Sequence, residues 1–398
     1  MSKHQTTYTP ELGKLLIAQF LTALADNAIL FVAVAMVLQG ALQGDWYVSA
    51  LQGCFLVAFV VLAPWVGEAA DAYSKPTILM LANIIKAFGA GMMVCGIHPL
   101  ISYAIVGVGA AMYSPAKYGI LPELLETHQG LMKANAWVEG STIIAILLGM
   151  ILGAAVADYS ITGALIGVFF LYLISAIVAK WMQDLPPVHP KTTHKRRIWQ
   201  SFFNSIQQLF TTPQARFATL GVSLFWAAAV VLRLLIIAWA PVVLLLHTSS
   251  DISLLTVFIA IGIAIGALLA PHLIPLTHVR RARWAAYGLG ITIVCFVFVD
   301  ELWLARSLLL IAGICGGIFV VPINAILQEI GHDSVGSGHA VAVQQFFENA
   351  AMLTVTLLYT WSVSSGIEAT SVMIVLGFTV LLLTLLISYK LPHVGNVQ

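Results

Sequence analysis

The sequence predicts an all-α integral membrane protein with twelve transmembrane helices in two pseudo-symmetric six-helix bundles. Of its 398 residues, 60% are hydrophobic and only 9% are charged, whereas soluble proteins carry about 25% charged residues. Twelve apolar segments are long enough to cross a bilayer, which takes about 20 residues. Asp26 and Arg233 lie in long apolar runs and are as far apart in the sequence as Pro115 and Pro322, which indicates a duplicated chain.

The expected spans follow one another through mostly short connections. They cover approximately residues 14–38, 47–67, 77–97, 100–123, 134–157, 161–183, 217–246, 253–276, 284–301, 305–329, 336–362 and 368–390. The first apolar run is too long for a cleaved signal peptide, so we expect a retained span. The spans divide the chain into an N-terminal bundle, residues 1–184, and a C-terminal bundle, residues 217–398.

A basic linker, residues 185–216, joins the two bundles. Its second part, RRIWQSFFNSIQQLF, repeats apolar residues at helical spacing. An amphipathic helix on the inner membrane surface fits this pattern, and so does a helical linker without special function. The Lys and Arg residues outside the spans all fall in the termini or in even-numbered connections, so the positive-inside rule predicts that both termini are cytoplasmic.

Charged side chains within the spans indicate a function. A charge at bilayer depth costs at least a few kcal/mol unless it faces a protein interior or water. The acidic and basic members of the set can balance one another: Asp26, Lys86, Lys117, Glu139, Arg233 and Glu348. Any one of them could merely pair with another and hold helices together, but the set predicts a polar pathway and therefore a transporter.

Two six-helix halves in parallel repeat are typical of the major facilitator superfamily, whose substrate site lies between the halves. In that arrangement all of these charges except Lys86 fall on cavity-lining helices, and Lys86 is expected to be structural. Polar neighbours extend the expected substrate site to Asn27, Tyr113, Gln344, Gln345 and Asn349.

The chemistry of this site suits a zwitterion or an anion. Lys117 and Arg233 can hold a phosphate, Arg in bidentate fashion, while Asp26, Glu139 or Glu348 can face an ammonium or a coupling cation. No cofactor is expected, and coupling to sodium or protons stays open. The spacing of the four cysteines does not match that of metal ligands. The sequence contains no basic stripe of the kind that binds nucleic acid and no catalytic motif of the kind found in enzymes.

A conformational gate is expected after the second span. Gly67, Asp71 and Lys75 match the superfamily's G-x-x-x-D-x-x-x-[RK] loop, in which the aspartate and the basic residue brace the closed cytoplasmic side. Ser74 stands where a glycine is usual, and Pro76 where further basic residues are common. The alternative is an ordinary turn in which Asp71 caps the next helix.

Longer stretches resemble the lysophospholipid transporter family. They are VGVGAAMYSPAKYGILPELL, LMKANAWVEGSTIIAILLG, AQFLTALADNAILF, SLFWAAAVVLRLL and VVPINAILQEIGHDSVGSGHAVAVQQFFENAAML. The resemblance implies movement of lysophospholipids, chiefly 2-acyl-glycerophosphoethanolamine, across the bacterial inner membrane by facilitated diffusion. A separate acyltransferase–acyl-carrier-protein synthetase would then restore the second acyl chain in the cytoplasmic leaflet. His339 departs from the family, in which an asparagine is expected.

Two other functions compete with this one. A cation-coupled exporter of amphiphilic drugs, from the same superfamily, would also use a membrane acid such as Asp26. A membrane-embedded acyltransferase would need the spacing H-x4-D, and His247 and Asp251 are one residue too close. The sequence therefore predicts a carrier rather than an enzyme.

Overall fold

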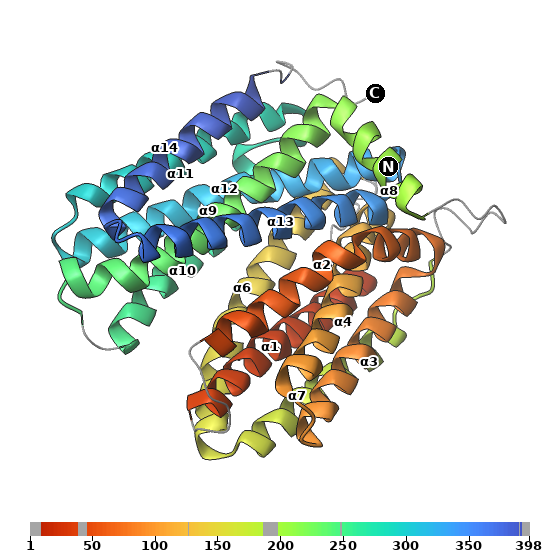
Figure 1. Ribbon diagram of the computed structural model, residues 1–398. Coiled ribbons are helices and arrows are strands. Elements are labelled where there is room, and N and C mark those ends of the chain that lie inside the picture. The colour runs from red at the N-terminus through yellow and green to blue at the C-terminus, as the bar shows by residue number, and fades with distance from the viewer. Residues whose placement is uncertain are drawn as a thin grey trace. The chain divides into compact units, whose positions relative to one another are not determined.

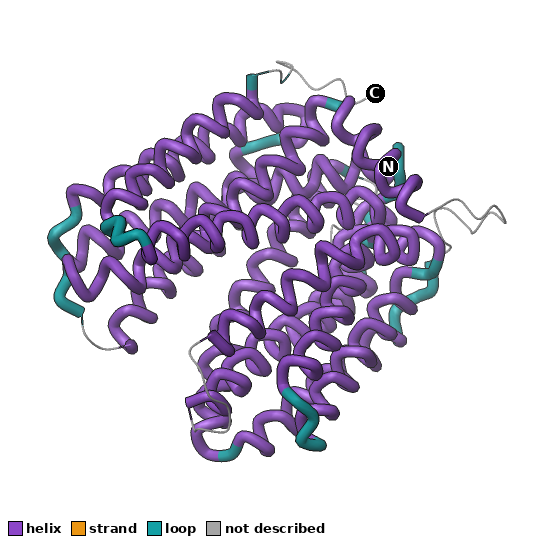
Figure 2. The backbone as a smooth tube through the Cα atoms, viewed as in Figure 1, coloured by secondary structure: helices purple, strands orange, loops and turns teal. Residues whose placement is uncertain are grey.

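The computed structural model describes residues 9–38, 46–125, 127–185, 198–246, 249–389 and 391. Within these ranges all regular structure is helical (Figures 1 and 2). The helices are α1 (Pro10–Leu38), α2 (Trp46–Ala72), α3 (Lys75–Val94), α4 (Pro99–Gly119), α5 (Leu121–Leu124), α6 (His128–Tyr159), α7 (Ile161–Lys180), α8 (Ile198–Thr211), α9 (Pro213–Val243), α10 (Ser249–Leu273), η1 (Leu276–Arg281), α11 (Ala282–Cys295), η2 (Phe296–Phe298), α12 (Leu302–Asp333), α13 (Ser337–Ser364) and α14 (Ala369–Ser388). The predicted fold class is confirmed.

Among the described residues, 11 helices are long and apolar enough to cross a membrane. The twelfth expected segment, 336–362, forms α13, which is not among them. α13 is 28 residues long, but it carries Gln344, Gln345, Glu348 and Asn349 in one stretch. A helix with so many polar groups can lie at bilayer depth only where protein or water surrounds those groups. The chain is a multi-pass membrane protein.

The chain forms two compact units. Unit 1 comprises Met1–Ala134, Ser141–Leu209 and Gln328–Phe346, and unit 2 comprises Asn135–Gly140, Phe210–Leu327 and Phe347–Gln398. Unit 1 therefore includes, besides the first spans, the end of α12 and the start of α13. The simpler division into residues 1–184 and 217–398 stays a prediction.

In unit 1, α3 packs along both α4 and α7, while α2 packs along α4 and α1 along α7 (Figure 1). The core between them is apolar and includes Ile29, Val106 and Val168. α3 and α4 approach closely at Gly109, where an added Cβ would lie 2.6 Å from both the Ala82 carbonyl oxygen and Lys86 Cγ. This glycine leaves room for the lysine stem inside the bundle.

In unit 2, α14 packs against α9 and α11. α10 and α12 meet backbone to backbone through two pairs of glycines, since a Cβ on Gly313 would lie 2.9 Å from Gly262 Cα and one on Gly266 would lie 3.0 Å from Gly317 Cα. Small residues at such a spacing let membrane helices approach closely enough for strong van der Waals contact.

The helical part of the expected linker is present as α8, in unit 1 apart from its last two residues. Phe202 is buried and its ring lies 5.7 Å from that of Phe346. Trp199 is exposed, and its ring lies 5.4 Å from that of Trp65. Part of the apolar face of α8 is therefore used against protein. The basic part of the linker, with Lys191, Lys195, Arg196 and Arg197, lies outside the described residues.

Candidate functional site

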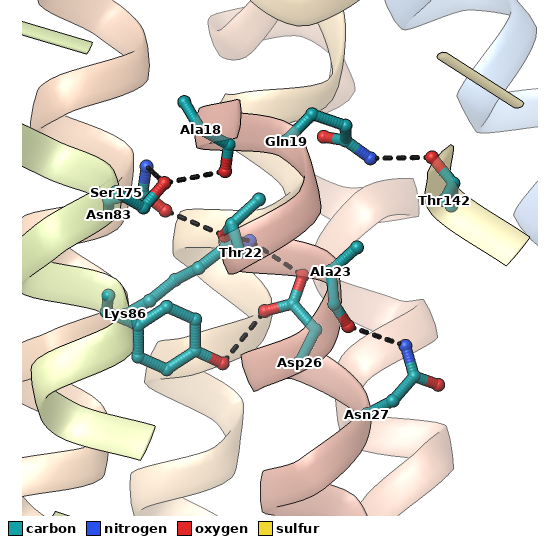
Figure 3. Close-up of polar contacts among 11 residues, drawn as sticks. Ala18, Gln19, Thr22, Ala23, Asp26, Asn27, Asn83, Lys86, Thr142 and Ser175 are labelled. Atoms are coloured by element: carbon teal, nitrogen blue, oxygen red, sulfur yellow. Dashed lines mark hydrogen bonds and ion pairs between the residues drawn. The ribbon is translucent and has the colours of Figure 1, made fainter. Parts of the chain in front are cut away.

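Asp26 lies within α1, and both of its carboxylate oxygens are engaged (Figure 3). Lys86 on α3 places its Nζ 2.8 Å from Asp26 Oδ2, and the Tyr172 hydroxyl on α7 donates to Oδ1 at 2.8 Å. The lysine side chain is 1% exposed and that of Asp26 is 20% exposed. The two contacts join α1, α3 and α7 of unit 1. Lys86, which was expected to be structural and apart from the site, is the direct partner of Asp26.

The Lys86 ammonium has two further kinds of contact. It donates to Thr22 Oγ1 at 3.1 Å. It also lies 4.9 Å from the ring centre of Tyr113 and 5.7 Å from that of Tyr172. The faces of aromatic rings attract cations, most strongly where water is excluded. A carboxylate, a hydroxyl and two rings thus surround the buried charge.

A chain of hydrogen bonds continues from this pair through the interior of unit 1 (Figure 3). The Thr22 hydroxyl donates to Asn83 Oδ1 at 2.7 Å, Asn83 Nδ2 donates to Ser175 Oγ at 2.9 Å, and Ser175 donates to the Ala18 carbonyl at 2.7 Å. All of these side chains are buried. A satisfied buried network of this kind fixes the relative positions of α1, α3 and α7.

The other predicted site residues of unit 1 lie on several helices. Asn27 donates its amide to the Ala23 carbonyl, one turn earlier in α1, at 2.8 Å. Tyr113 is buried, and its hydroxyl has no hydrogen-bond partner in the described part of the chain. Lys117 is buried, with its ammonium 4.0 Å from the Tyr118 ring centre. Gln344 is buried and Gln345 is partly buried.

The remaining predicted residues belong to unit 2. Glu139 is buried and accepts a hydrogen bond from Asn324 Nδ2 at 3.2 Å. Glu348 and Asn349 are also buried. Arg233 is exposed and forms no ion pair with a described residue. That Asp26 and Arg233 line one pathway stays a prediction.

Unit 2 also contains an apolar pocket bounded by α9, α10, α11 and α12. Its lining consists of Phe225, Ala228, Ala229, Leu232, Ile259, Ile263, Leu289, Ile293, Ala312 and Gly313. Its volume is only about 40 Å³, the space of roughly three water molecules, so it is a small gap in the apolar packing between these helices.

The predicted gate residues Gly67, Asp71 and Lys75 lie close to the start of α13 in unit 1, and we call this cluster the latch. Asp71 Oδ1 accepts from the Gly338 amide at 2.7 Å, and Oδ2 accepts from the His339 amide at 2.8 Å and lies 2.7 Å from His339 Nδ1. Asp71 thus caps the start of α13, where free amides and the helix dipole favour an anion. It does not cap α3, whose N-cap residue is Ser74 and which has no side-chain cap.

Gly67 and Asp71 differ from the prediction in being helical rather than part of a loop, because α2 continues to Ala72. Their spacing of four places them on one face of that helix. A Cβ on Gly67 would lie 2.8 Å from Ala342 Cβ, so this glycine allows α13 to approach α2. Gly338 plays the same part on α13, where a Cβ would lie 2.7 Å from Ala70 Cβ.

Lys75, the first residue of α3, completes the latch. Its ammonium lies 3.8 Å from Asp71 Oδ1 and forms a closer ion pair with Glu123 of α5. Nearby in the same unit, Ser337 donates to the Gly119 carbonyl at 2.9 Å, and His128 Nδ1 lies 3.0 Å from Glu329 Oε2. Polar contacts therefore join the start of α13 to α2 and α4, and the end of α12 to α6.

Sequence reasoning missed several partners, among them Lys86 and Tyr172 at Asp26, Glu123 at Lys75 and His339 at Asp71. A signal for the first was present, since Asp26 and Lys86 are opposite charges in neighbouring spans of the same bundle. The hydroxyl of Tyr172 had no such signal, because a tyrosine in an apolar segment usually serves packing.

Comparisons with known proteins agree on the family. Residues 15–356 match the family model of the Major Facilitator Superfamily. The chain is 43% identical over 347 residues to the lysophospholipid transporter LplT of Serratia proteamaculans (strain 568), and this alignment covers 87% of each chain. It is 40% identical over 371 residues to the lysophospholipid transporter LplT of Klebsiella pneumoniae subsp. pneumoniae, and this alignment covers 93% of each chain.

Solved structures show the same fold at lower identity. The Escherichia coli fucose:proton symporter FucP aligns with a TM-score of 0.74 at 14% identity, covering 97% of this chain and 100% of that one. The human organic anion transporter MFSD10 aligns with a TM-score of 0.73 at 14% identity, covering 95% and 100%. At such identity the likeness extends to the fold alone.

Proposed function

The chain belongs to the Major Facilitator Superfamily and, within it, to the lysophospholipid transporter family, and on this basis we propose that it carries lysophospholipids across a membrane. The observation that carries the proposal is identity of 40% or more to lysophospholipid transporters along 87–93% of the chain. The chain acts as a carrier that alternates access to the two sides of the membrane, with no catalytic step.

The charged residues of the spans support this substrate class. A lysophospholipid with an ethanolamine headgroup carries a phosphate and an ammonium, and 2-acyl-glycerophosphoethanolamine is the main substrate in this proposal. Arg233 and Lys117 bind the phosphate, since Arg can present two parallel donors to it. Asp26 and Glu348 face the ammonium, while Asn27, Tyr113, Glu139, Gln344, Gln345 and Asn349 supply hydrogen bonds.

The single acyl chain requires apolar surroundings. Each buried methylene stabilises a bound chain by about 0.8 kcal/mol. The polar and apolar parts of the substrate would thus meet different parts of the carrier.

The latch is the proposed gate of this carrier. With both termini in the cytoplasm, the end of the bundle that contains Asp71, Lys75 and the start of α13 faces the cytoplasm. The closed latch then blocks exit on that side, and it opens to deliver lysolipid to the cytoplasmic leaflet of the bacterial inner membrane. An acyltransferase–acyl-carrier-protein synthetase acts there as the functional partner.

Transport into proteoliposomes tests the proposal. Purified protein is reconstituted, and the movement of labelled lysophosphatidylethanolamine from the outer to the inner leaflet is followed. The expected result is movement well above that in protein-free liposomes, with two-chain phosphatidylethanolamine as a control that is not moved. Equal rates with and without protein would refute the function.

Two variants test the proposed residue roles in the same assay. Arg233→Ala and Asp26→Ala are expected to slow transport about tenfold or more, because each removes a charge that the headgroup would meet. Arg216→Ala, outside the proposed site, is the matched control. Parental rates in both site variants would overturn the roles. Export of amphiphilic drugs in place of lysolipid uptake would instead favour the competing facilitator function.

A further inference from the structure

The Asp26 carboxylate already has a cation beside it. Lys86 Nζ lies 2.8 Å from Oδ2, and the lysine side chain is 1% exposed, so its charge belongs to the interior of unit 1. The ammonium also donates to Thr22 Oγ1 and lies against the rings of Tyr113 and Tyr172. These contacts hold it in place without any group from outside the protein.

The charge of a carboxylate at bilayer depth can be compensated in three ways. The carboxylate can take up a proton, bind a metal cation such as sodium, or pair with a basic side chain. The first two make a carrier depend on an ion from solution. The third does not, because the cation stays with the protein throughout the transport cycle.

We propose that Lys86 is the built-in counter-cation of Asp26 and takes the place that a sodium ion or a proton would occupy in an ion-coupled carrier. Lys86 is thus a positioning residue, which orients the Asp26 carboxylate and compensates its charge. The Tyr172 hydroxyl holds the other oxygen at 2.8 Å. Since a carboxylate can accept about four hydrogen bonds, two acceptor positions of this 20% exposed group stay available to a headgroup ammonium.

The groups around Asp26 fit this role. The titratable side chains that interact with Asp26 among the described residues are Lys86 on α3, Tyr103 and Tyr113 on α4, and Tyr172 on α7. Lys86 is the basic member of that set, and the others are neutral phenols. Removing the lysine charge would therefore leave the carboxylate without its nearby cation.

The first test uses the wild-type protein and rests on the proposed function. Labelled lysophosphatidylethanolamine transport in proteoliposomes is measured in sodium chloride and in choline chloride, with and without a proton gradient. We expect the same rate in all conditions. A rate that needs sodium or a proton gradient would overturn the proposal.

The second test converts the protein into an ion-dependent one. Lys86→Met keeps an unbranched stem as long as that of lysine up to Cε and removes the charged ammonium group. Its transport is expected to fall about tenfold or more in choline at neutral pH, as after the loss of one partner of a buried ion pair. Sodium or acidic pH should restore much of the rate, because either compensates Asp26. Lys86→Arg should keep the parental behaviour.

Two controls separate this role from a merely structural one. In the double variant Asp26→Asn/Lys86→Met no charge remains to be compensated, so its residual rate should not respond to sodium or pH. Lys180→Met removes an exposed lysine of α7 and should behave as the parent. A Lys86→Met protein that ignores sodium and pH, whether active or inactive, would overturn the proposal.

A third measurement does not depend on transport. The melting temperature of each detergent-purified protein is compared in sodium and choline and at neutral and acidic pH. Sodium or acid should raise the melting temperature of Lys86→Met and leave that of the double variant unchanged. If the wild type moves no lysolipid, the proposed function fails while this measurement still decides the role of Lys86. An unchanged melting temperature for Lys86→Met would contradict it.

Discussion

Asp26 owes its position to contacts from two other helices. Lys86 and Tyr172 each hold one carboxylate oxygen at 2.8 Å. In a low-dielectric interior such bonds are strong, and a partner that is left unpaired is costly. The same arrangement that makes a membrane acid tolerable therefore also fixes its orientation.

Removing one of these contacts should have a measurable cost. Tyr172→Phe deletes the hydroxyl that donates to Asp26 Oδ1 and leaves that oxygen without its donor. The expected destabilisation is about 1–3 kcal/mol, seen as a lower melting temperature, together with slower lysolipid transport. Tyr159→Phe, at a tyrosine that is 95% exposed, is the control. Equal stability of Tyr172→Phe and wild type would show that the bond contributes little.

The start of α13 depends on another helix for its cap. Asp71, from α2, accepts from the amides of Gly338 and His339, and Gly67 and Gly338 keep the two helices close enough for these bonds. His339 adds its ring nitrogen to the same carboxylate. An asparagine at this position, as expected from the family, would offer an amide donor in place of the imidazole.

Asp71→Asn should loosen this helix start. The amide side chain keeps one acceptor oxygen but lacks the charge that favours a helix N-terminus, so the Gly338 and His339 amides should lose protection. Hydrogen–deuterium exchange of the peptide containing them is expected to speed up about tenfold, as a weakening of roughly 1.4 kcal/mol implies. Asp300→Asn, at an exposed aspartate, is the control. Unchanged exchange would mean that Asp71 does not hold the latch.

The chain as a whole is a membrane carrier of the Major Facilitator Superfamily. Its helices bury glycine-lined contacts and polar networks, whereas many large apolar side chains are exposed, for example Phe88, Phe170 and Leu386. In a bilayer these exposed side chains face hydrocarbon, which removes the cost that water would impose on them.

The orientation of the whole chain in the membrane can be tested with fusion proteins. The distribution of Lys and Arg predicts that both termini lie in the cytoplasm. A green fluorescent protein fused after Gln398 should therefore fluoresce, and an alkaline phosphatase fused there should be inactive. The opposite pair of results would reverse the orientation and place the latch on the outer side of the membrane. A phosphatase fused in the connection at Asp300 is the control and should be active.

Apolar run length and charge distribution determined the membrane class, the all-helical fold and the residues worth examining, because bilayer thickness and the cost of buried charge act on any chain. The motif with Gly67, Asp71 and Lys75 also located the latch. Only the tertiary structure decided which groups meet. Lys86 is 60 residues from Asp26, and His339 is 268 residues from Asp71. Such pairs depend on which helix faces are adjacent, and sequence spacing within one helix does not define that.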